Sequence, residues 1–224
     1  MWSYYGTKKR LAKYYPKPDH NLIIEPFAGA AQYSLHGDNW KKGVLLYDKY
    51  PAITDLWRYL ISASRSWIED LPDLKKGDCL DDFKSLRPAE KILLGFFCNP
   101  SSAMPKKTCT PRGETHWKRG KQQIINNLHK VRHWMIGCKS YEDISDKFKA
   151  TWFIDPPYQY GGEYYHSSVC NKYINYDHLG DWCKKRQGQV IVCENSKADW
   201  LDFKNLHELH GQRNAKTMEV IYTQ

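Results

Sequence analysis

The 224-residue sequence lacks the features that mark membrane, exported, repetitive and disordered chains. No apolar run approaches the roughly 18 residues that span a bilayer. The longest clean apolar stretches, such as residues 44–47, have the length of a strand. The amino terminus is polar and aromatic and has no apolar signal core, so we expect a protein that is not exported. No internal repeat or low-complexity segment is present, which excludes solenoids and disordered chains.

Paired cysteines are absent as well. The seven cysteines are scattered singly without a Cys-x-x-Cys spacing, and several stand in apolar surroundings, as Cys193 does. This usage is typical of buried free thiols in a reducing compartment. Cys109 and His116 could contribute to a zinc site, but a second ligand pair at metal spacing is missing, so we expect no metal.

Acidic residues are scarce in two segments of the chain. There are 34 Lys and Arg against 25 Asp and Glu, which gives a net charge of +9. Residues 1–18 hold five basic residues and no acid, and residues 99–136 hold eight basic residues against Glu114 alone. Basic charge that is localised in this way predicts a polyanionic partner rather than a device for solubility.

Strand-sized apolar runs alternate with helical spacing along most of the chain. The pattern predicts strands near residues 22–24, 44–47, 151–154, 189–193 and 218–222, and helices over 52–67, 88–98 and 121–135. Such alternation is typical of a parallel α/β sheet with crossover helices. Residues 99–120 are rich in Pro, Ser, Thr, Gly and basic residues, which favours a loop. We therefore predict an inserted lobe over 95–140 in a domain made of 1–94 and 141–224.

Three of the predicted strands end in an acid, namely Glu25, Asp48 and Asp155. Ligands of open α/β sheets bind beyond these carboxyl ends. The small-residue loop after the first strand contains Gly29, and Asp48 follows 19 residues later. A loop that the ligand can approach and a carboxylate for ribose hydroxyls suit a nucleoside-containing cofactor. One glycine is not a Gly-x-Gly-x-x-Gly fingerprint, and a tight strand-to-helix turn explains the loop equally well.

The tetrapeptide Asp155-Pro156-Pro157-Tyr158 follows a predicted buried strand. Two prolines fix φ and remove two backbone donors, which leaves rigid carbonyl acceptors. A carboxylate, such an acceptor and an aromatic ring form a site for an amino group on a planar base. The alternative is a proline turn that ends a strand and carries a surface tyrosine.

Together with Glu25-Pro26-Phe27-Ala28-Gly29-Ala30 and Tyr4-Tyr5-Gly6-Thr7-Lys8, this tetrapeptide resembles the motifs of Dam-type DNA adenine methyltransferases in their alpha arrangement. The resemblance covers nearly the whole chain. It implies a Rossmann-like S-adenosylmethionine-dependent methyltransferase sheet with a small inserted target-recognition lobe. It also implies methyl transfer to the exocyclic amino group of adenine in DNA, with flipping of the base. Ala31 departs from the family pattern, which has a second glycine there.

The resemblance also assigns roles to residues. The catalytic set would be Asp155, Pro156, Pro157 and Tyr158: the aspartate and Pro156 accept hydrogens from the amino group, and the tyrosine stacks on the base. The cofactor S-adenosylmethionine would be bound by Tyr4, Lys8, Glu25, Pro26, Phe27, Ala28, Gly29, Ala30, Asp48 and Asp155. Within that set, Lys8 would face the carboxylate of the cofactor and Asp48 its ribose hydroxyls.

The basic segment of the lobe is the predicted DNA interface. Its candidate phosphate and groove contacts are Lys106, Lys107, Arg112, Lys118, Arg119 and Lys121. A solvated basic loop is the alternative. The segment Gly161–Tyr165 is predicted to form a flexible lid or a plain glycine turn. Residues 213–216 would either contact DNA or form a basic hairpin loop.

Three rival functions remain open at this stage. Amino methylation of cytosine uses the same acceptor geometry, although Asp155 favours adenine over cytosine. Methylation of RNA is a second rival, because basic patches do not distinguish sugars. A non-catalytic nucleic-acid binder is the third. The leading prediction is a cytoplasmic enzyme of a bacterium or phage-infected cell, acting on double-stranded DNA without a membrane or obligate protein partner.

Overall fold

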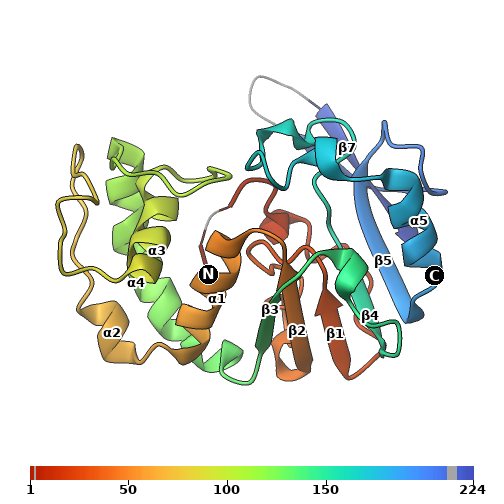
Figure 1. Cartoon of the computed structure of the whole chain (residues 1–224), viewed down its shortest axis with the longest axis horizontal. Coiled ribbons are helices and arrows are strands. Elements are labelled where there is room, and N and C mark those ends of the chain that lie inside the picture. Colours follow the sequence, from red (N-terminus) through yellow and green to blue (C-terminus); the bar gives the residue numbers. More distant parts are fainter. Residues whose placement is uncertain (3, 211–215) are drawn as a thin grey trace.

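The computed structural model describes residues 1–2, 4–210 and 216–224 (Figure 1). The strands are β1 (Leu22–Glu25), β2 (Gly43–Asp48), β3 (Met135–Cys138), β4 (Lys149–Ile154), β5 (Gln187–Asn195), β6 (Lys204–His210) and β7 (Lys216–Thr223). The α-helices are α1 (Pro51–Ser62), α2 (Arg65–Glu69), α3 (Pro88–Cys98), α4 (Pro111–Val131) and α5 (Tyr176–Lys184). Short 3₁₀ turns include η1 (Lys8–Arg10), η4 (Gly162–Tyr164) and η5 (Asn171–Tyr173). Most of the basic loop over 213–216 lies outside the described residues.

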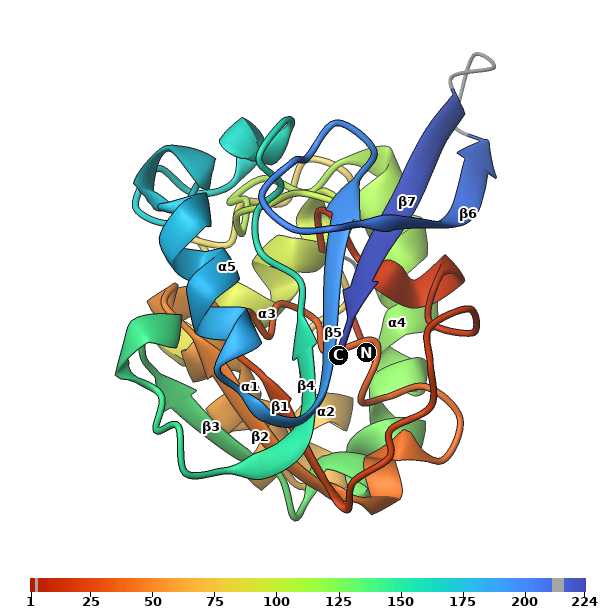
Figure 2. The same cartoon turned by 90° about the vertical axis from the view of Figure 1, so that its right-hand side faces the viewer.

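The strands form one seven-stranded sheet in the order β3-β2-β1-β4-β5-β7-β6. Neighbouring strands are parallel, except that β7 runs antiparallel to both β5 and β6. Strands β6 and β7 extend beyond the rest of the sheet as a long hairpin (Figure 2). The chain builds outward from β1 to β2 and β3 and then crosses to β4, so the topological switch point lies between β1 and β4. This is a mostly parallel, Rossmann-like α/β sheet, as the sequence predicted.

Alternating side chains on the strands bury both faces of the sheet. On β1, Ile23 belongs to a core shared with α1, α3 and α4, whereas its neighbour Ile24 belongs to a second core on the side of α5. On β4, Phe153 and Trp152 divide between the two cores in the same way. A sheet that is covered on both faces requires strands that are apolar throughout, which is why these strands were recognisable in the sequence.

The helical part of the chain differs from the prediction. Residues 111–120, which were expected to be a loop, form the first half of α4. Pro111 occupies the first turn, and the Thr110 hydroxyl accepts a hydrogen bond from the Gly113 amide at 3.0 Å. Glycines lower helix propensity, but a Cβ at Gly113 or Gly120 would collide with α3 at Cys98 or Phe97. The glycines therefore permit close helix packing, and this packing outweighs their low propensity.

The boundaries of the inserted lobe also change. Residues 135–138, which end the predicted lobe, form the edge strand β3 of the sheet and pair with β2. This strand is short, contains Gly137 and is only partly buried, so its sequence lacks a strand pattern. Helices α3 and α4 pack on each other and on α1, and α2 packs on α4, so that α2, α3 and α4 lie together at the left of Figure 1.

All seven cysteines are free thiols, and five of them are buried. Within the described ranges, no helix combines the length and the apolar character needed to cross a bilayer.

Candidate functional site

Three acids meet at the carboxyl edge of the sheet. Glu25 ends β1, Asp48 ends β2 and Asp155 follows β4, and these strands are neighbours in the order β2-β1-β4. A pocket with about 940 Å³ of empty space, part of it open to solvent, lies over this edge. This first pocket is lined by all ten residues that the sequence assigned to a cofactor. Whether these residues bind a cofactor stays a prediction.

Asp48 organises the small-residue loop that follows β1. Its Oδ2 accepts a hydrogen bond from the Gly29 amide at 3.0 Å, and its Oδ1 accepts one from the Tyr50 amide at 2.9 Å. Burial raises the pKa of Asp48 to about 6, although these two backbone hydrogen bonds oppose the rise. Gly29 has φ +44°, and an added Cβ would press on the ring of Tyr4. The absence of a side chain at Gly29 therefore lets the Tyr4 ring pack directly against the backbone of this loop.

Glu25 is the deepest of the three acids and is 2% exposed. One of its oxygens accepts a hydrogen bond from the Ser34 amide at 3.0 Å, and burial raises its pKa to about 8. The carboxyl group therefore holds a proton through much of the neutral pH range. Ala31, in the same loop, has φ +45°, which is the left-handed conformation that glycine adopts without strain. The backbone thus keeps the geometry of a glycine at the position where the chain departs from the family pattern.

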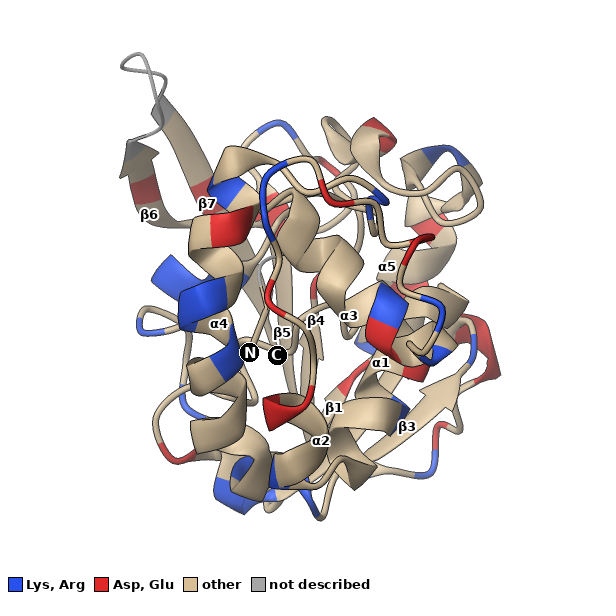
Figure 3. Cartoon of the chain, turned by 90° about the vertical axis from the view of Figure 1, so that its left-hand side faces the viewer, with Lys and Arg blue, Asp and Glu red and all other residues tan. Residues whose placement is uncertain are grey.

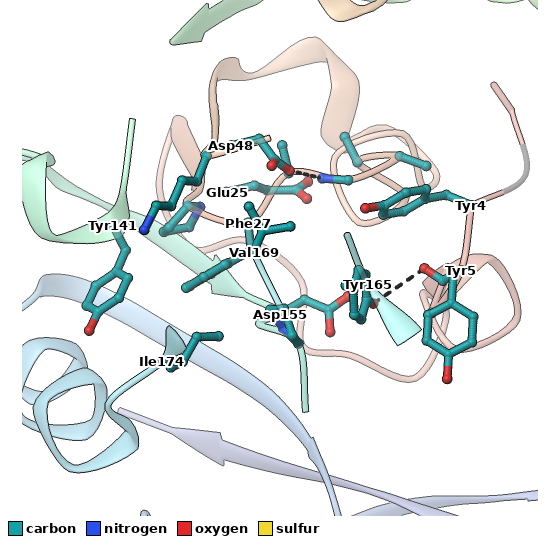
Figure 4. A pocket seen from close by; sticks show the side chains of 18 of the residues that line it. Tyr4, Tyr5, Glu25, Phe27, Asp48, Tyr141, Asp155, Tyr165, Val169 and Ile174 are labelled. Carbon is teal, nitrogen blue, oxygen red and sulfur yellow. Dashed lines mark hydrogen bonds between the residues drawn. The ribbon is translucent and has the colours of Figure 1, made fainter. Parts of the chain in front are cut away.

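The other end of the first pocket is apolar. Phe27 lies 5.6 Å from Tyr141, measured between ring centroids, and the side chains of Val169 and Ile174 face the same space (Figure 4). Such a slot suits a flat purine ring. Sequence reasoning found Phe27 but missed the other three residues. They lie in loops after β3 and before α5, where single apolar residues carry no pattern.

A second pocket, with about 1520 Å³ of empty space including open solvent, lies beside the first. Residues 4–8 line both pockets and form the wall between them. The segment Gly161–Tyr165, predicted as a lid, packs against this wall. The Tyr5 hydroxyl donates to the Gly161 carbonyl at 3.3 Å, and the Tyr165 hydroxyl donates to the Tyr5 carbonyl at 3.4 Å (Figure 4).

Lys8 connects the wall to the tetrapeptide of residues 155–158. Its ammonium nitrogen lies 2.8 Å from Oδ1 of Asp155 and 4.5 Å from the ring centroid of Tyr158. Burial alone would lower the pKa of Lys8, but the charges of Asp155 and Glu219 raise it above its ordinary value. Burial also raises the pKa of Asp155 to about 6, against the opposing effect of Lys8. The sequence prediction placed Lys8 against a cofactor carboxylate, whereas its partner in this structure is Asp155.

The backbone of the tetrapeptide is anchored from both sides. The Tyr176 hydroxyl donates to the Pro157 carbonyl at 2.6 Å, so this acceptor is engaged within the protein. Beyond the prolines, the Gln159 amide donates to Glu194 at 2.6 Å, and Glu194 is fully buried at the end of β5. Pro156 is buried and Tyr158 lines the second pocket. The tetrapeptide therefore presents Asp155 to the first pocket and the tyrosine to the second.

The six predicted DNA-binding residues do not lie on a single surface. The Lys121 ammonium donates to the Leu71 carbonyl at 2.5 Å, which turns it toward the protein. Lys107 pairs with Asp81 at 2.7 Å. Residues three or four positions apart lie on the same face of a helix. Arg112 precedes His116 by four residues and Arg119 follows it by three, so all three lie on one face of α4. Basic residues follow this helix in Figure 3.

Lys9 of η1 extends the face of Arg112 and Arg119. The pKa of His116 is lowered by its partial burial and by the positive charges of Arg112, Arg119 and Lys9. We call these three basic residues with His116 the basic face of α4. Lys118 lies on a different side of the helix, as does Glu114, whose carboxylate accepts a hydrogen bond from the Lys76 amide. Lys106, in the loop between α3 and α4, is exposed.

Comparisons with known proteins give little beyond the fold. No protein-family model matches the chain, and no curated protein matches it. A solved structure named "Putative methyltransferase yhhF from Escherichia coli" aligns with 89% of this chain and 73% of its own, at 11% sequence identity and a TM-score of 0.37. A likeness at this level carries no functional argument, and the function is argued below from the geometry of the site.

Proposed function

We propose that this chain transfers a methyl group from S-adenosylmethionine to the exocyclic amino group of adenine in DNA, with the base flipped out of the duplex. One observation carries the proposal. A largely buried carboxylate at the topological switch point, Asp155, binds a nitrogen donor, the Lys8 ammonium, which also lies over the ring of Tyr158. A carboxylate beside an aromatic face is the environment that an amino group on a flat base requires.

The residues of the first pocket fit the proposed cofactor. The apolar slot of Phe27 and Tyr141 suits its adenine, Asp48 can accept from ribose hydroxyls, and Gly29 leaves room for close approach. The wall residues Tyr4 and Lys8 border the side that would take the methionine part. When bound, the cofactor supplies an electrophilic methyl group on a sulfonium sulfur.

The second pocket would take the flipped base. The base must leave the stack because its amino nitrogen is inaccessible there. Tyr158 presents its ring to this pocket, and Asp155 lies beyond Lys8 on the side of the cofactor pocket. Lys8 contacts Oδ1 of Asp155, and a carboxylate accepts further hydrogen bonds through its other oxygen. On this proposal, the methyl donor in the first pocket and the target base in the second would approach Asp155 from opposite sides.

The protein contributes orientation and polarisation to the reaction. Asp155 accepts a hydrogen from the amino group, which directs the nitrogen lone pair toward the methyl donor and makes it more electron-rich. The nitrogen–methyl bond forms as the sulfur–methyl bond breaks. The methylated nitrogen then loses its proton, so a strong base is not needed before transfer. A carboxylate with a pKa of about 6 can accept this proton near neutral pH.

The charge distribution supports DNA as the substrate. Lys9 of the basic face of α4 directly follows Lys8, and residues 4–8 line the second pocket. A duplex bound along these residues would bring its bases toward Tyr158. Phosphates of DNA and RNA are equivalent for such contacts, so the choice of DNA rests on the resemblance of the motifs.

The test uses unmethylated duplex DNA and tritiated-methyl S-adenosylmethionine, followed by nucleoside digestion and chromatography. We expect the label in N6-methyladenine. Asp155→Asn should bind the cofactor but lose about 10²- to 10³-fold in transfer rate, whereas Asp70→Asn, at the exposed end of α2, should match the wild type. Label in methylcytosine would overturn the base assignment, and label in RNA alone would overturn the substrate. A chain that binds no cofactor would be a nucleic-acid binder.

A further inference from the structure

Strand β7 carries a buried acid, Glu219, that has no part in the reaction proposed above. Glu219 is 4% exposed and stands between Met218 and Val220 in a strand that is hydrogen-bonded on both sides. It also lines the second pocket. A carboxylate on a buried strand is costly unless its oxygens are paired, so its partners indicate what it is for.

The partners of Glu219 come from two segments that are distant from it in the sequence, the tetrapeptide and the amino-terminal segment 1–18. The Tyr158 hydroxyl donates to its Oε1 at 2.7 Å, and the Tyr15 hydroxyl donates to the same oxygen at 2.6 Å. The Lys8 ammonium lies 3.9 Å from this oxygen. Glu219 therefore joins the aromatic ring of the tetrapeptide to the cation that binds Asp155.

We propose that Glu219 is a positioning residue for methyl transfer, which holds the Tyr158 ring in the orientation that stacks on the target base. The inference rests on the proposed function. Prolines 156 and 157 fix the backbone before the ring, and the bond to Glu219 fixes its hydroxyl end. A ring that is held at both ends needs no reorganisation when the base arrives.

The two tyrosines depend on Glu219 to different extents. Tyr15 is packed in the core, with its ring centroid 5.0 Å from that of Phe153 and 6.4 Å from that of Tyr33. Tyr158 packs against the edge of the core and also borders the second pocket, so core packing covers only part of its ring. Loss of the Glu219 carboxylate should therefore leave Tyr15 in place and loosen Tyr158. Strand β7 itself is retained by its pairing with β5 and β6.

A double-mutant cycle tests this assignment in the full chain. Glu219→Met keeps the length of the side chain without an oxygen that accepts from Tyr158, and Tyr158→Phe keeps the ring without its hydroxyl. We expect each to lower kcat for methyl transfer to duplex DNA by about tenfold, as misplaced reacting groups do. The double variant should lose no more than either single one, because both remove the same contact. Tyr15→Phe, which removes the other donor, should change kcat less than about twofold.

Cofactor binding and thermal unfolding are measured on the same variants. Unchanged cofactor affinity with reduced kcat supports a positioning role, and so does a weakened fluorescence rise of 2-aminopurine placed in the DNA, which reports unstacking of the base. A wild-type rate in Glu219→Met, or losses that multiply in the double variant, would overturn the assignment of Glu219 and leave the proposed function standing. A wild-type chain that transfers no methyl group would overturn the proposed function and this inference with it. If the Glu219 variant does not fold, Tyr158→Phe alone tests the inference, and full activity of that variant would reject it.

Discussion

The Lys8 ammonium and the Asp155 carboxylate form a buried ion pair, with 2.8 Å between nitrogen and oxygen. The side chains are 7% and 19% exposed, so solvent screens the pair only weakly. A nitrogen donor thus already lies on the carboxylate that would bind the target amino group. The Lys8 ammonium lies over the Tyr158 ring, where the proposed target base would stack. Its ion pair with Asp155 balances the charge of the carboxylate before any substrate binds.

The ion pair leads to a prediction about stability. Lys8→Met should lower the free energy of unfolding by about 3–5 kcal/mol, because it leaves the Asp155 charge buried without its partner. Adding Asp155→Asn to this variant should restore part of the loss, since the unpaired charge is then gone. Urea unfolding measures both, with Lys13→Met at an exposed lysine as the control. Equal stability of the single and double variants would contradict the prediction.

The pKa of Asp155 leads to a prediction about pH. Burial raises this pKa to about 6, so the carboxylate is ionised above pH 6 and protonated below it. The ionised form accepts from the amino group through the oxygen that Lys8 does not contact, whereas protonation of that oxygen turns it into a donor. We therefore expect kcat/KM to fall about tenfold per pH unit below pH 6 and to level off above it. Residual activity of Asp155→Asn should show no such inflection, and a wild-type profile that is flat through pH 6 would contradict the assignment.

The wall between the pockets leads to a prediction about cofactor affinity. Gly6 has φ +71°, and an added Cβ would collide with the Tyr165 hydroxyl. Gly6→Ala should weaken cofactor binding by about tenfold, because a 1 Å displacement of the wall disturbs the pocket. Gly37→Ala is the matched control, since Gly37 has φ +52° and open space around it. Tyr165→Phe in the Gly6→Ala background should recover part of the affinity; no recovery would place the defect elsewhere.

The basic face of α4 leads to a prediction about salt dependence. Arg119→Gln should weaken duplex binding and reduce the log–log salt slope by about 0.9, the value for one phosphate contact. Lys118→Gln removes the same charge from another side of the helix and should leave the slope unchanged. Fluorescence anisotropy at several KCl concentrations measures both. Equal slopes for the two variants would mean that net charge, rather than this face, determines binding.

Local patterns made much of the sheet and of the first pocket predictable. Buried strands read as continuous apolar runs, and the acids at their ends were identified because parallel strands bring their carboxyl ends to one edge. The ten residues assigned to the cofactor line one pocket for that reason. The start of α4 was missed, because Gly113 and Gly120 lower local propensity and are explained only by contact with α3.

The sequence by itself determined the alternation of strands and helices, the order of the three motifs and the concentration of basic charge. These properties depend on neighbouring residues, whose side chains and backbone angles are constrained together. The tertiary structure alone decided the partners of the tetrapeptide. Glu219 is 61 residues from Tyr158 and 204 residues from Tyr15, and all three meet only because β7 inserts antiparallel beside β5. No local pattern encodes a contact that is formed by the order of strands in a sheet.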